Sequence, residues 1–460
     1  MELPVPNRRM TSLDAGFLYL ERPHAPLHVG CLLRLDDSIS LGRVLSQLKS
    51  RLPRMRRFTQ RAVPAPLSLA HPAWEDDADF DVRNHVQRWC VCRPGREREL
   101  DELVATLMAR PLDLDQPMWE AHLLEGLQDG SAALLLKVHH CMLDGISGAA
   151  LLDLLLEATP RSARPVAESP PDDAPGASLR AASAVSAALV DPARRAAEAL
   201  AVLGRPGALR RCGTALRDAG SFALAATLGR QSRLPWNAPL GLRRRLAFLR
   251  LSLADARWVR SAYGGTINDV VLTMLAGGLR RYLQATGAPL RDAALDALVP
   301  VSLRAPGQAR ALGNRISALR VPLAVTPDSE QERLAVTCAS MEQLKARRAF
   351  EGVALLIGAI ELLPAPLVAL AAGATPLDML AHLVATNVPG PREPRYFAGR
   401  SVRAIHAISP ITDGMGLSVA VFSYAGWLHV SLHADADLVP DLDKLSAGIE
   451  EGFAALRSGS

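Results

Sequence analysis

The nine residues from Lys137 to Gly145 bring two adjacent imidazoles, a carboxylate and a glycine into a segment whose flanks are apolar. An imidazole has an ordinary pKa of ~6.5, so it can accept a hydroxyl proton near neutral pH and return it to a leaving group. Residues 132–138 form a short apolar run, and residues 146–156 carry apolar side chains at helical spacing. The pattern places the polar cluster at a strand-to-helix turn, where side chains are exposed at the end of a sheet.

The adjacent pair His139 and His140 predicts a division of roles. Neighbouring side chains on a strand face opposite sides, so one ring can face a cavity while the other packs into the scaffold. The residues themselves do not decide which ring does which. A core histidine is the commoner role for such a pair, and half of a metal site is another. Zinc is disfavoured, because metalloprotease helices place two histidines four residues apart with a glutamate between them.

The complete string His-His-x-x-x-Asp-Gly resembles the active-site signature of the CoA-dependent acyltransferase superfamily, which includes chloramphenicol acetyltransferases and peptide synthetase condensation domains. Further stretches narrow the resemblance to the bacterial wax ester synthase/acyl-CoA:diacylglycerol acyltransferase family. They occur in the family's order and cover nearly the whole chain: Ser12-Leu-Asp-Ala-Gly-Phe17, Pro111-Leu-Asp113, Pro117-Met-Trp-Glu120, Thr266-Ile-Asn-Asp-Val270, Val299-Pro-Val-Ser-Leu-Arg304, Gly313-Asn314, Thr386-Asn-Val-Pro-Gly-Pro391 and Ser409-Pro-Ile-Thr-Asp-Gly-Met-Gly416.

This resemblance implies an α/β fold of two chloramphenicol-acetyltransferase-like lobes, with mixed sheets flanked by helices and an active-site tunnel between them. It implies a long-chain acyl-CoA as donor and diacylglycerol or a long-chain fatty alcohol as acceptor, with no metal, further cofactor or covalent intermediate. Two enzymatic alternatives are another hydroxyl acceptor and a carrier-protein donor. An alternative of a different class is an inactive relative that binds a lipid surface.

Within the motif, the resemblance assigns the general base to His140, a supporting role to His139 and a structural, orienting role to Asp144. We expect Arg304 to pair with Asp144, because a buried carboxylate beside the base must be neutralised. The superfamily also uses an arginine from the corresponding strand. A surface position is the alternative for Arg304.

Asn268 lies in the first turn of a helix predicted over residues 266–283. An amide donor there can join the positive end of the helix dipole in facing a developing oxyanion, and a helix cap is its alternative role. For Trp119, plain packing in the core is the alternative to a substrate contact. The residues expected to contact substrate are Gly145, Trp119, Asp269 and Ser409.

The composition limits the partners. The 460 residues are long for one core, so two domains are expected. A net charge of +5 suits a CoA phosphate or an acidic membrane surface, but it is too small and diffuse to indicate nucleic-acid binding. The six cysteines show no paired framework, which favours the reducing cytoplasm, with the inner membrane face or lipid droplets as a peripheral location. The polar, proline-broken start argues against a signal peptide.

Composition shifts divide the chain into a first lobe at residues 1–160, a linker and Ala/Arg-rich connector at 161–235, and a second lobe at 236–460. The connector could lie on an anionic bilayer or droplet surface, or it could pack on the protein. Alanine makes a helix only weakly amphipathic, which slightly favours packing on the protein.

Residues 353–372 are strongly apolar but are interrupted by Glu361, Pro364 and Pro366. The intervals are too short to span a bilayer, which needs ~20 uninterrupted apolar residues. This segment is expected to form buried helices that line an acyl-chain tunnel. Residues 386–391 are expected to form a rigid loop.

Overall fold

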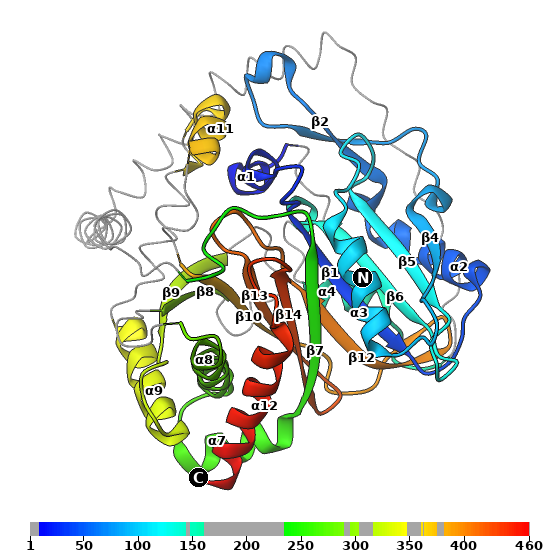
Figure 1. Cartoon of the computed structure of the whole chain (residues 1–460). Helices are drawn as coiled ribbons and strands as arrows, with labels where there is room; N and C mark the ends of the chain where they lie inside the picture. Colours follow the sequence, from blue (N-terminus) through cyan, green and yellow to red (C-terminus); the bar gives the residue numbers. More distant parts are fainter. Residues whose placement is uncertain are drawn as a thin grey trace.

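The computed structural model describes residues 9–143, 148–160, 234–288, 295–302, 316–346, 360–361, 363–374 and 381–459. Asp144, Gly145 and Arg304 lie outside these ranges, as does nearly all of the predicted connector 161–235. The described chain builds two six-stranded sheets that lie next to each other, each with helices against it (Figure 1). The predicted two-lobed α/β fold is confirmed, and the tunnel between the lobes stays a prediction.

The first sheet carries the predicted hairpin that delivers the two histidines. Its order is β11-β12-β1-β6-β5-β4, built from β1 (His28–Leu35), β4 (Val86–Cys90), β5 (Trp119–Glu125), β6 (Ala133–His139), β11 (Tyr396–Phe397) and β12 (Arg400–Ile408). β5 and β6 pair antiparallel, as predicted, whereas β4 and β5 are parallel, so the sheet is mixed. His139 is the last residue of β6 and lies opposite His28 of β1.

Helices cover both faces of this sheet. Leu32 of β1 packs in a cluster with α3 (Glu97–Ala109), whereas its neighbour Leu33 packs with α2 (Leu41–Arg51) and α4 (Gly148–Leu155). Because neighbouring side chains of a strand face opposite sides, a strand covered on both faces has to be apolar at successive positions. The apolar run at the start of β6 meets that requirement.

The second sheet is also mixed, with the order β7-β14-β13-β10-β8-β9. Its strands are β7 (Arg244–Ser252), β8 (Leu295–Ser302), β9 (Ile316–Leu323), β10 (Leu383–Pro389), β13 (Leu417–Tyr424) and β14 (Trp427–Asp435). The predicted hairpin of β13 and β14 is confirmed. β10 runs parallel to both of its neighbours, β8 and β13.

The loop predicted for residues 386–391 is wrong over its first part. Thr386, Asn387 and Val388 are ladder positions of β10, with Thr386 opposite Ala420 and Asn387 opposite Val421 of β13. Pro389 occupies the last position of the strand, where the lack of an N–H does least harm. The proline and glycine therefore end the strand here and do not prevent it.

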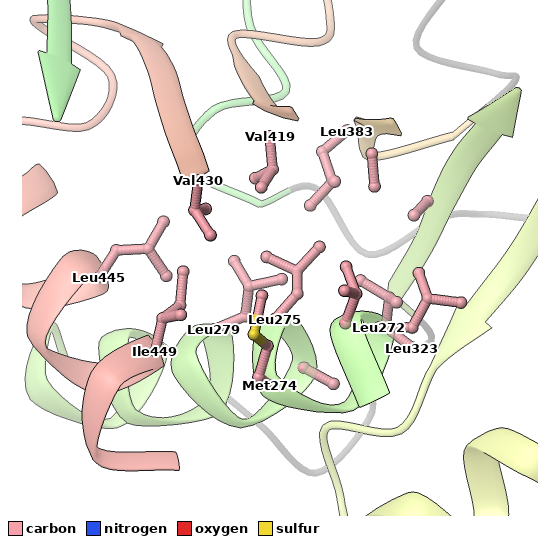
Figure 2. Packing of buried hydrophobic residues seen from close by; sticks show 14 of the residues in the cluster. Leu272, Met274, Leu275, Leu279, Leu323, Leu383, Val419, Val430, Leu445 and Ile449 are labelled. Atoms are coloured by element: carbon pink, nitrogen blue, oxygen red, sulfur yellow. The ribbon is translucent and has the colours of Figure 1, made fainter. Parts of the chain in front are cut away.

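Among the described residues, the helices that pack on the second sheet include α7 (Leu253–Tyr263), α8 (Ile267–Ala285), α9 (Glu330–Ala346) and α12 (Leu442–Ser458). α3 of the first lobe also packs on β7, so it lies between the two sheets. α8 lies between the sheet and its neighbouring helices, so almost its whole length is buried. A Cβ on Gly278 would lie 2.4 Å from Ile449 Cγ1, so this glycine allows α12 to approach closely. Figure 2 shows the resulting core, where Leu272, Leu275 and Leu279 of α8 and Leu445 and Ile449 of α12 lie near Leu383, Val419 and Val430 of the sheet.

One strand crosses between the two halves of the sequence. β12 follows β10 in the chain but pairs antiparallel with β1, from Gly30 opposite Ile408 to Leu35 opposite Val402. The sheet assigned from sequence to residues 1–160 is thus completed by residues 396–408. The lobe boundary near residue 236 stays a prediction.

Two further helices lie at the histidine end of the first sheet. α1 (Ser12–Leu20) contacts both the short helix η5 (His140–Leu143) and α11 (Ala365–Ala374), which lies beside it in Figure 1. The prediction of buried helices is wrong for α11, because Leu367 and Leu370 are 50% and 69% exposed. Only the side of α11 that carries Val368 packs inward. None of the helices in the described ranges is long and apolar enough to cross a membrane.

Candidate active site

The two adjacent histidines have different surroundings. His139 closes β6, where its N–H donates to the Met118 carbonyl at 2.9 Å, and its side chain is fully buried. His140 opens η5, where its N–H donates to the Leu27 carbonyl at 3.0 Å, and it remains partly exposed. The two rings therefore differ in burial, with His139 in the scaffold and His140 just beyond the end of β6.

The tautomer of His139 follows from its hydrogen bonds. The Cys141 N–H donates to its Nδ1 at 3.3 Å, and the Cys141 Sγ lies 2.9 Å from the same nitrogen. The ring proton therefore lies on Nε2, which donates to Glu21 Oε2 at 2.5 Å. Glu21 also accepts from the Leu27 N–H at 3.1 Å. The sequence did not single out Glu21, and the only signal was a carboxylate just after a short apolar segment.

The His140 ring is held by stacking. It lies 3.9 Å from the Phe17 ring, centroid to centroid, at an interplanar angle of 19°. Its Nδ1 is buried and has no hydrogen bond of ordinary geometry. Burial lowers the pKa of His140 to about 4, and the neighbouring His139 contributes to this lowering, against a small opposing effect of the residue's own main chain. The imidazole is therefore neutral at physiological pH, which is the form a general base requires.

Asn268 is not the cap of α8, so that alternative is wrong. Thr266 occupies the N-cap position, and its hydroxyl accepts from the Asp269 N–H, while Asp269 accepts from the Thr266 N–H at 2.8 Å. Asn268 lies inside the first turn, and its Oδ1 accepts from Asn387 Nδ2 at 3.3 Å. Its own amide nitrogen is then the donor that remains for a ligand, at the positive end of a 19-residue helix.

The other predicted contact residues have structural partners. Asp269 forms the capping box with Thr266. The Trp119 ring is buried, donates from Nε1 to the Phe58 carbonyl at 2.8 Å and stacks on His85 at 4.7 Å. These contacts agree with plain packing for Trp119. The substrate contacts expected of Asp269 and Trp119 stay predictions.

Ser409 joins the two sheets. It directly follows β12, and its Oγ lies 3.4 Å from the Thr386 Oγ1 of β10. Its carbonyl accepts from Ser418 Oγ at 3.0 Å and from His433 Nδ1 at 2.7 Å. A residue so bound to both sheets can fix their relative position, and the substrate contact predicted for it stays a prediction.

The strand register relates the two halves of the candidate site. β1 pairs His28 with His139 on one side and Gly30 with Ile408 on the other, so His140 and Ser409 lie at the same edge of the first sheet. From Ser409 the contacts continue through Thr386 of β10, whose next residue binds Asn268. Phe17 and Val388 also pack on one shared hydrophobic cluster. The candidate base thus directly follows a strand of the first sheet, and the candidate amide binds a strand of the second, where the two sheets are joined.

The cavity found in the first lobe lies away from the candidate site. A cavity of about 510 Å³, lined by Trp89, Cys90 and Glu125 among others, lies at the opposite end of β5 from Trp119. Within the described ranges, no group of three or more histidine, cysteine, aspartate or glutamate side chains could hold a metal ion.

Solved structures place the two-lobed fold in a known class. The first condensation domain of the calcium-dependent antibiotic synthetase matches with a TM-score of 0.58 at 20% identity, over 98% of this chain and 97% of that one. The wax ester synthase/diacylglycerol acyltransferase from Marinobacter aquaeolei VT8 matches with a TM-score of 0.69 at 25% identity, over 98% of this chain and 99% of that one. The fold is that of condensation-type acyltransferase domains.

Sequence comparison identifies the family. Residues 10–271 match the wax ester synthase/diacylglycerol acyltransferase catalytic domain, and residues 312–457 match the WS/DGAT C-terminal domain. A probable diacylglycerol O-acyltransferase of Mycobacterium tuberculosis H37Rv, tgs1, is 34% identical, with 97% of this chain and 95% of that protein covered. The chain belongs to the wax ester synthase/diacylglycerol acyltransferase family, so the resemblance seen in the sequence and the acyltransferase class are confirmed.

Proposed function

We propose that the protein transfers a long-chain fatty acyl group from acyl-CoA to the hydroxyl of diacylglycerol or of a long-chain fatty alcohol. The product is triacylglycerol or a wax ester, and free CoA is released. Membership of the family over both of its domains supports this reaction. The observation that carries it is the neutral, stacked imidazole of His140 at the edge where the two sheets meet.

In this mechanism, His140 accepts the proton of the acceptor hydroxyl while the oxygen attacks the thioester carbonyl carbon. The tetrahedral intermediate places negative charge on the former carbonyl oxygen, which the amide of Asn268 and the start of α8 stabilise. Collapse breaks the carbon–sulfur bond, and the CoA thiolate recovers the proton from His140. The base is therefore regenerated in each cycle.

The low pKa of His140 has a consequence for this mechanism. Burial disfavours the imidazolium that forms during proton transfer. The negative charge that develops on the substrate at the same moment offsets this effect, because opposite charges at short distance attract. The proton transfer and the attack are therefore expected to be concerted.

Three assignments in this mechanism stay predictions from the sequence. Asp144 orients the motif and pairs with Arg304, and Gly145 contacts the substrate. An Asp144→Asn variant and an Arg304→Lys variant that both fold and turn over normally would contradict the pairing. We further propose that the reaction needs no cofactor and no bound metal, with acyl-CoA as a substrate.

The acceptors dissolve in lipid, so we also propose peripheral contact with a membrane or droplet surface. α11 supports this part of the proposal. It presents Leu367 and Leu370 to solvent, as Leu363 does just before it, and no charged side chain occurs between residues 362 and 374. The Leu13 N–H donates to Glu361 Oε1 at 3.4 Å, which ties this segment to α1 and so to the ring that stacks on His140. A monolayer that receives these leucines would hold acceptors close to His140.

The reaction is tested with purified protein and palmitoyl-CoA, offered hexadecanol or diolein, with thiol release and lipid product measured together. Ester formation with either acceptor supports the proposal. Turnover only with other hydroxyl compounds, or only with a carrier-protein thioester, would favour those alternatives. Lipid binding without any thioester turnover would favour an inactive lipid-surface protein.

The surface contact is tested by flotation with phosphatidylglycerol-containing vesicles. A Leu367→Ser, Leu370→Ser double variant is expected to float less, while a Leu242→Ser variant, which changes an exposed leucine outside α11, serves as the matched control. Equal flotation of the double variant and the unaltered protein would contradict a role of α11.

A further inference from the structure

Glu21 is a buried carboxylate that the mechanism does not use. It is the C-cap residue of α1, and its side chain is only 10% exposed. Its Oε2 accepts two hydrogen bonds, one from the ring Nε2 of His139 at the end of β6 and one from the main-chain N–H of Leu27 just before β1. A carboxylate held in this way fixes the position of both donors, because charge-assisted hydrogen bonds are short and directional.

Both groups bound by Glu21 adjoin the main chain of His140. Leu27 holds His140 through its carbonyl oxygen, at 3.0 Å from the His140 nitrogen. His139 is the residue directly before His140 and is paired with His28, directly after Leu27. Glu21 therefore completes a closed loop of contacts. The loop runs from the Glu21 carboxylate to Leu27, from Leu27 to His140, and through His139 back to the carboxylate.

Glu21 also fixes the position of the ring that stacks on His140. Its N–H donates to the Phe17 carbonyl at 3.2 Å, which ends α1 one turn after Phe17. The carboxylate thus attaches the end of α1 to the strands, while the helix carries the Phe17 ring to within 3.9 Å of the imidazole. The main chain and the ring plane of His140 are both set by contacts that lead to Glu21.

We propose that Glu21 is a positioning residue for His140, which acts by hydrogen-bonding His139 and Leu27 on either side of the base. This inference rests on the proposed role of His140 as the general base. Glu21 touches neither the reacting atoms nor the substrate in this account. It holds His139 in one tautomer, and it holds the segment that carries His140 against the start of β1.

The test compares Glu21→Ala and Glu21→Gln in the full chain, with palmitoyl-CoA and hexadecanol as substrates. The alanine variant is expected to lose roughly 10–100-fold in kcat, the usual effect of removing a group that orients a functional histidine. KM for palmitoyl-CoA should be nearly unchanged, because the lost interaction serves only the transition state. The glutamine variant should retain most of the activity, because its amide oxygen can still accept from His139 Nε2.

Nitrogen-15 NMR of histidine-labelled protein provides a readout that is independent of turnover. The His139 ring is expected to show a protonated Nε2 in the unaltered protein and in Glu21→Gln, and a mixture of tautomers in Glu21→Ala. A control variant, Glu157→Gln, removes another buried carboxylate of the same lobe, which is bound to Arg51 and Gln47 at 2.8 Å. It should lower the melting temperature without changing kcat per folded enzyme or the His139 signals.

Two results would overturn the proposal. One is Glu21→Ala with the kcat of the unaltered enzyme, and the other is Glu21→Gln as impaired as Glu21→Ala. If Glu21→Ala does not fold, Glu21→Met takes its place, because it fills similar space but accepts no hydrogen bond. A similar loss of kcat in Glu21→Met supports the proposal, and an unchanged kcat overturns it. An active His140→Ala variant would instead remove the base assignment itself, so the two failures are distinguishable.

Discussion

The candidate base and the candidate amide are held by different means in the two lobes. At the histidine end of the first sheet, buried polar groups bind one another: Glu21 with His139, and Lys137 with Glu120 at 3.1 Å and with the Arg110 carbonyl at 2.9 Å. In the second lobe, α8 positions Asn268 through a long apolar contact with the sheet and α12 (Figure 2).

This difference predicts different consequences of mutation. A hydrogen-bonded cluster fixes angles and tautomers, so its loss should reduce turnover more than stability. An apolar core is stabilised by buried apolar surface and close packing. Truncation of one core side chain should therefore reduce stability and leave the geometry of the remaining folded protein intact. The amide of Asn268 is the exception in the second lobe, since it touches the reacting atoms in the proposed mechanism.

The largest effect is expected for His140→Ala. Without the base, the hydroxyl proton has no acceptor in the site, so turnover of palmitoyl-CoA with hexadecanol should fall by at least ~10³-fold, more than the loss of one oxyanion donor. His139→Ala should be milder and partly a folding defect. Single-turnover thiol release, normalised to folded protein by circular dichroism, measures both. Equal turnover of His140→Ala and the unaltered enzyme would refute the base assignment.

The next effect is expected for Asn268→Ala. Removing one oxyanion donor typically lowers kcat by ~10²–10³-fold. Asn387→Ala should have a smaller effect, because Asn387 only orients the Asn268 amide through the 3.3 Å contact. Steady-state kcat for both variants gives the comparison, and a greater loss in Asn387→Ala than in Asn268→Ala would contradict these roles.

Leu275→Ala is expected to act on stability alone. Leu275 is 1% exposed between α8 and the second sheet, and truncation of such a leucine costs about 2–5 kcal/mol of unfolding free energy. Urea unfolding measures the loss, and kcat per folded enzyme should stay unchanged. A large fall in kcat at full folding would show that α8 transmits packing changes to Asn268, and would weaken the contrast between the lobes.

The smallest expected effect is the loss of unfolding free energy on acidification, counted for each buried histidine. Burial lowers the pKa of His429 and of His433 to about 4, below the ordinary ~6.5 of an unfolded chain. The unfolded state then binds more protons, so stability is complete above pH ~6.5 and is lost as the pH falls toward 4. At pH 5.5 each group should cost about 1.4 kcal/mol, on the order of one pKa unit.

Thermal melts between pH 7.5 and 5 measure this loss. His429→Phe should reduce the acid sensitivity, because phenylalanine binds no proton and keeps a ring against His406. An unchanged pH dependence in this variant would exclude His429 from the acid response.

The sequence predicted those parts that depend on local patterns. The hairpin of β5 and β6 and the helix after Thr266 both follow from the periodicity of neighbouring residues. The two-lobed fold followed from motifs in a known order. Such signals lie within a few residues of one another, so one chain suffices to detect them.

Contacts between distant parts of the chain were not predicted. Glu21 meets His139 across 118 residues and Asn387 meets Asn268 across 119, and no local pattern marks either pair. In β10, the proline and glycine led to the prediction of a loop, although β-branched residues precede them. The structure instead has a strand there, because a parallel strand on each side stabilises the extended chain. In α11, the apolar composition led to the prediction of a buried helix. Sequence alone does not distinguish a buried apolar helix from one that exposes its apolar side chains.

The strand that crosses from one half of the chain to the other constrains how the enzyme can open. β12 pairs with β1, with one irregularity between Arg34 and Leu35, and is followed directly by Ser409, which contacts Thr386 of the second sheet. A wide separation of the two sheets would therefore break the contacts of Ser409. A bulky acyl-CoA and a water-insoluble acceptor are therefore expected to enter by rearrangement of side chains and surface segments around a fixed frame. A fragment that ends near residue 160 would leave β1 with a bare edge, so it should self-associate when expressed alone.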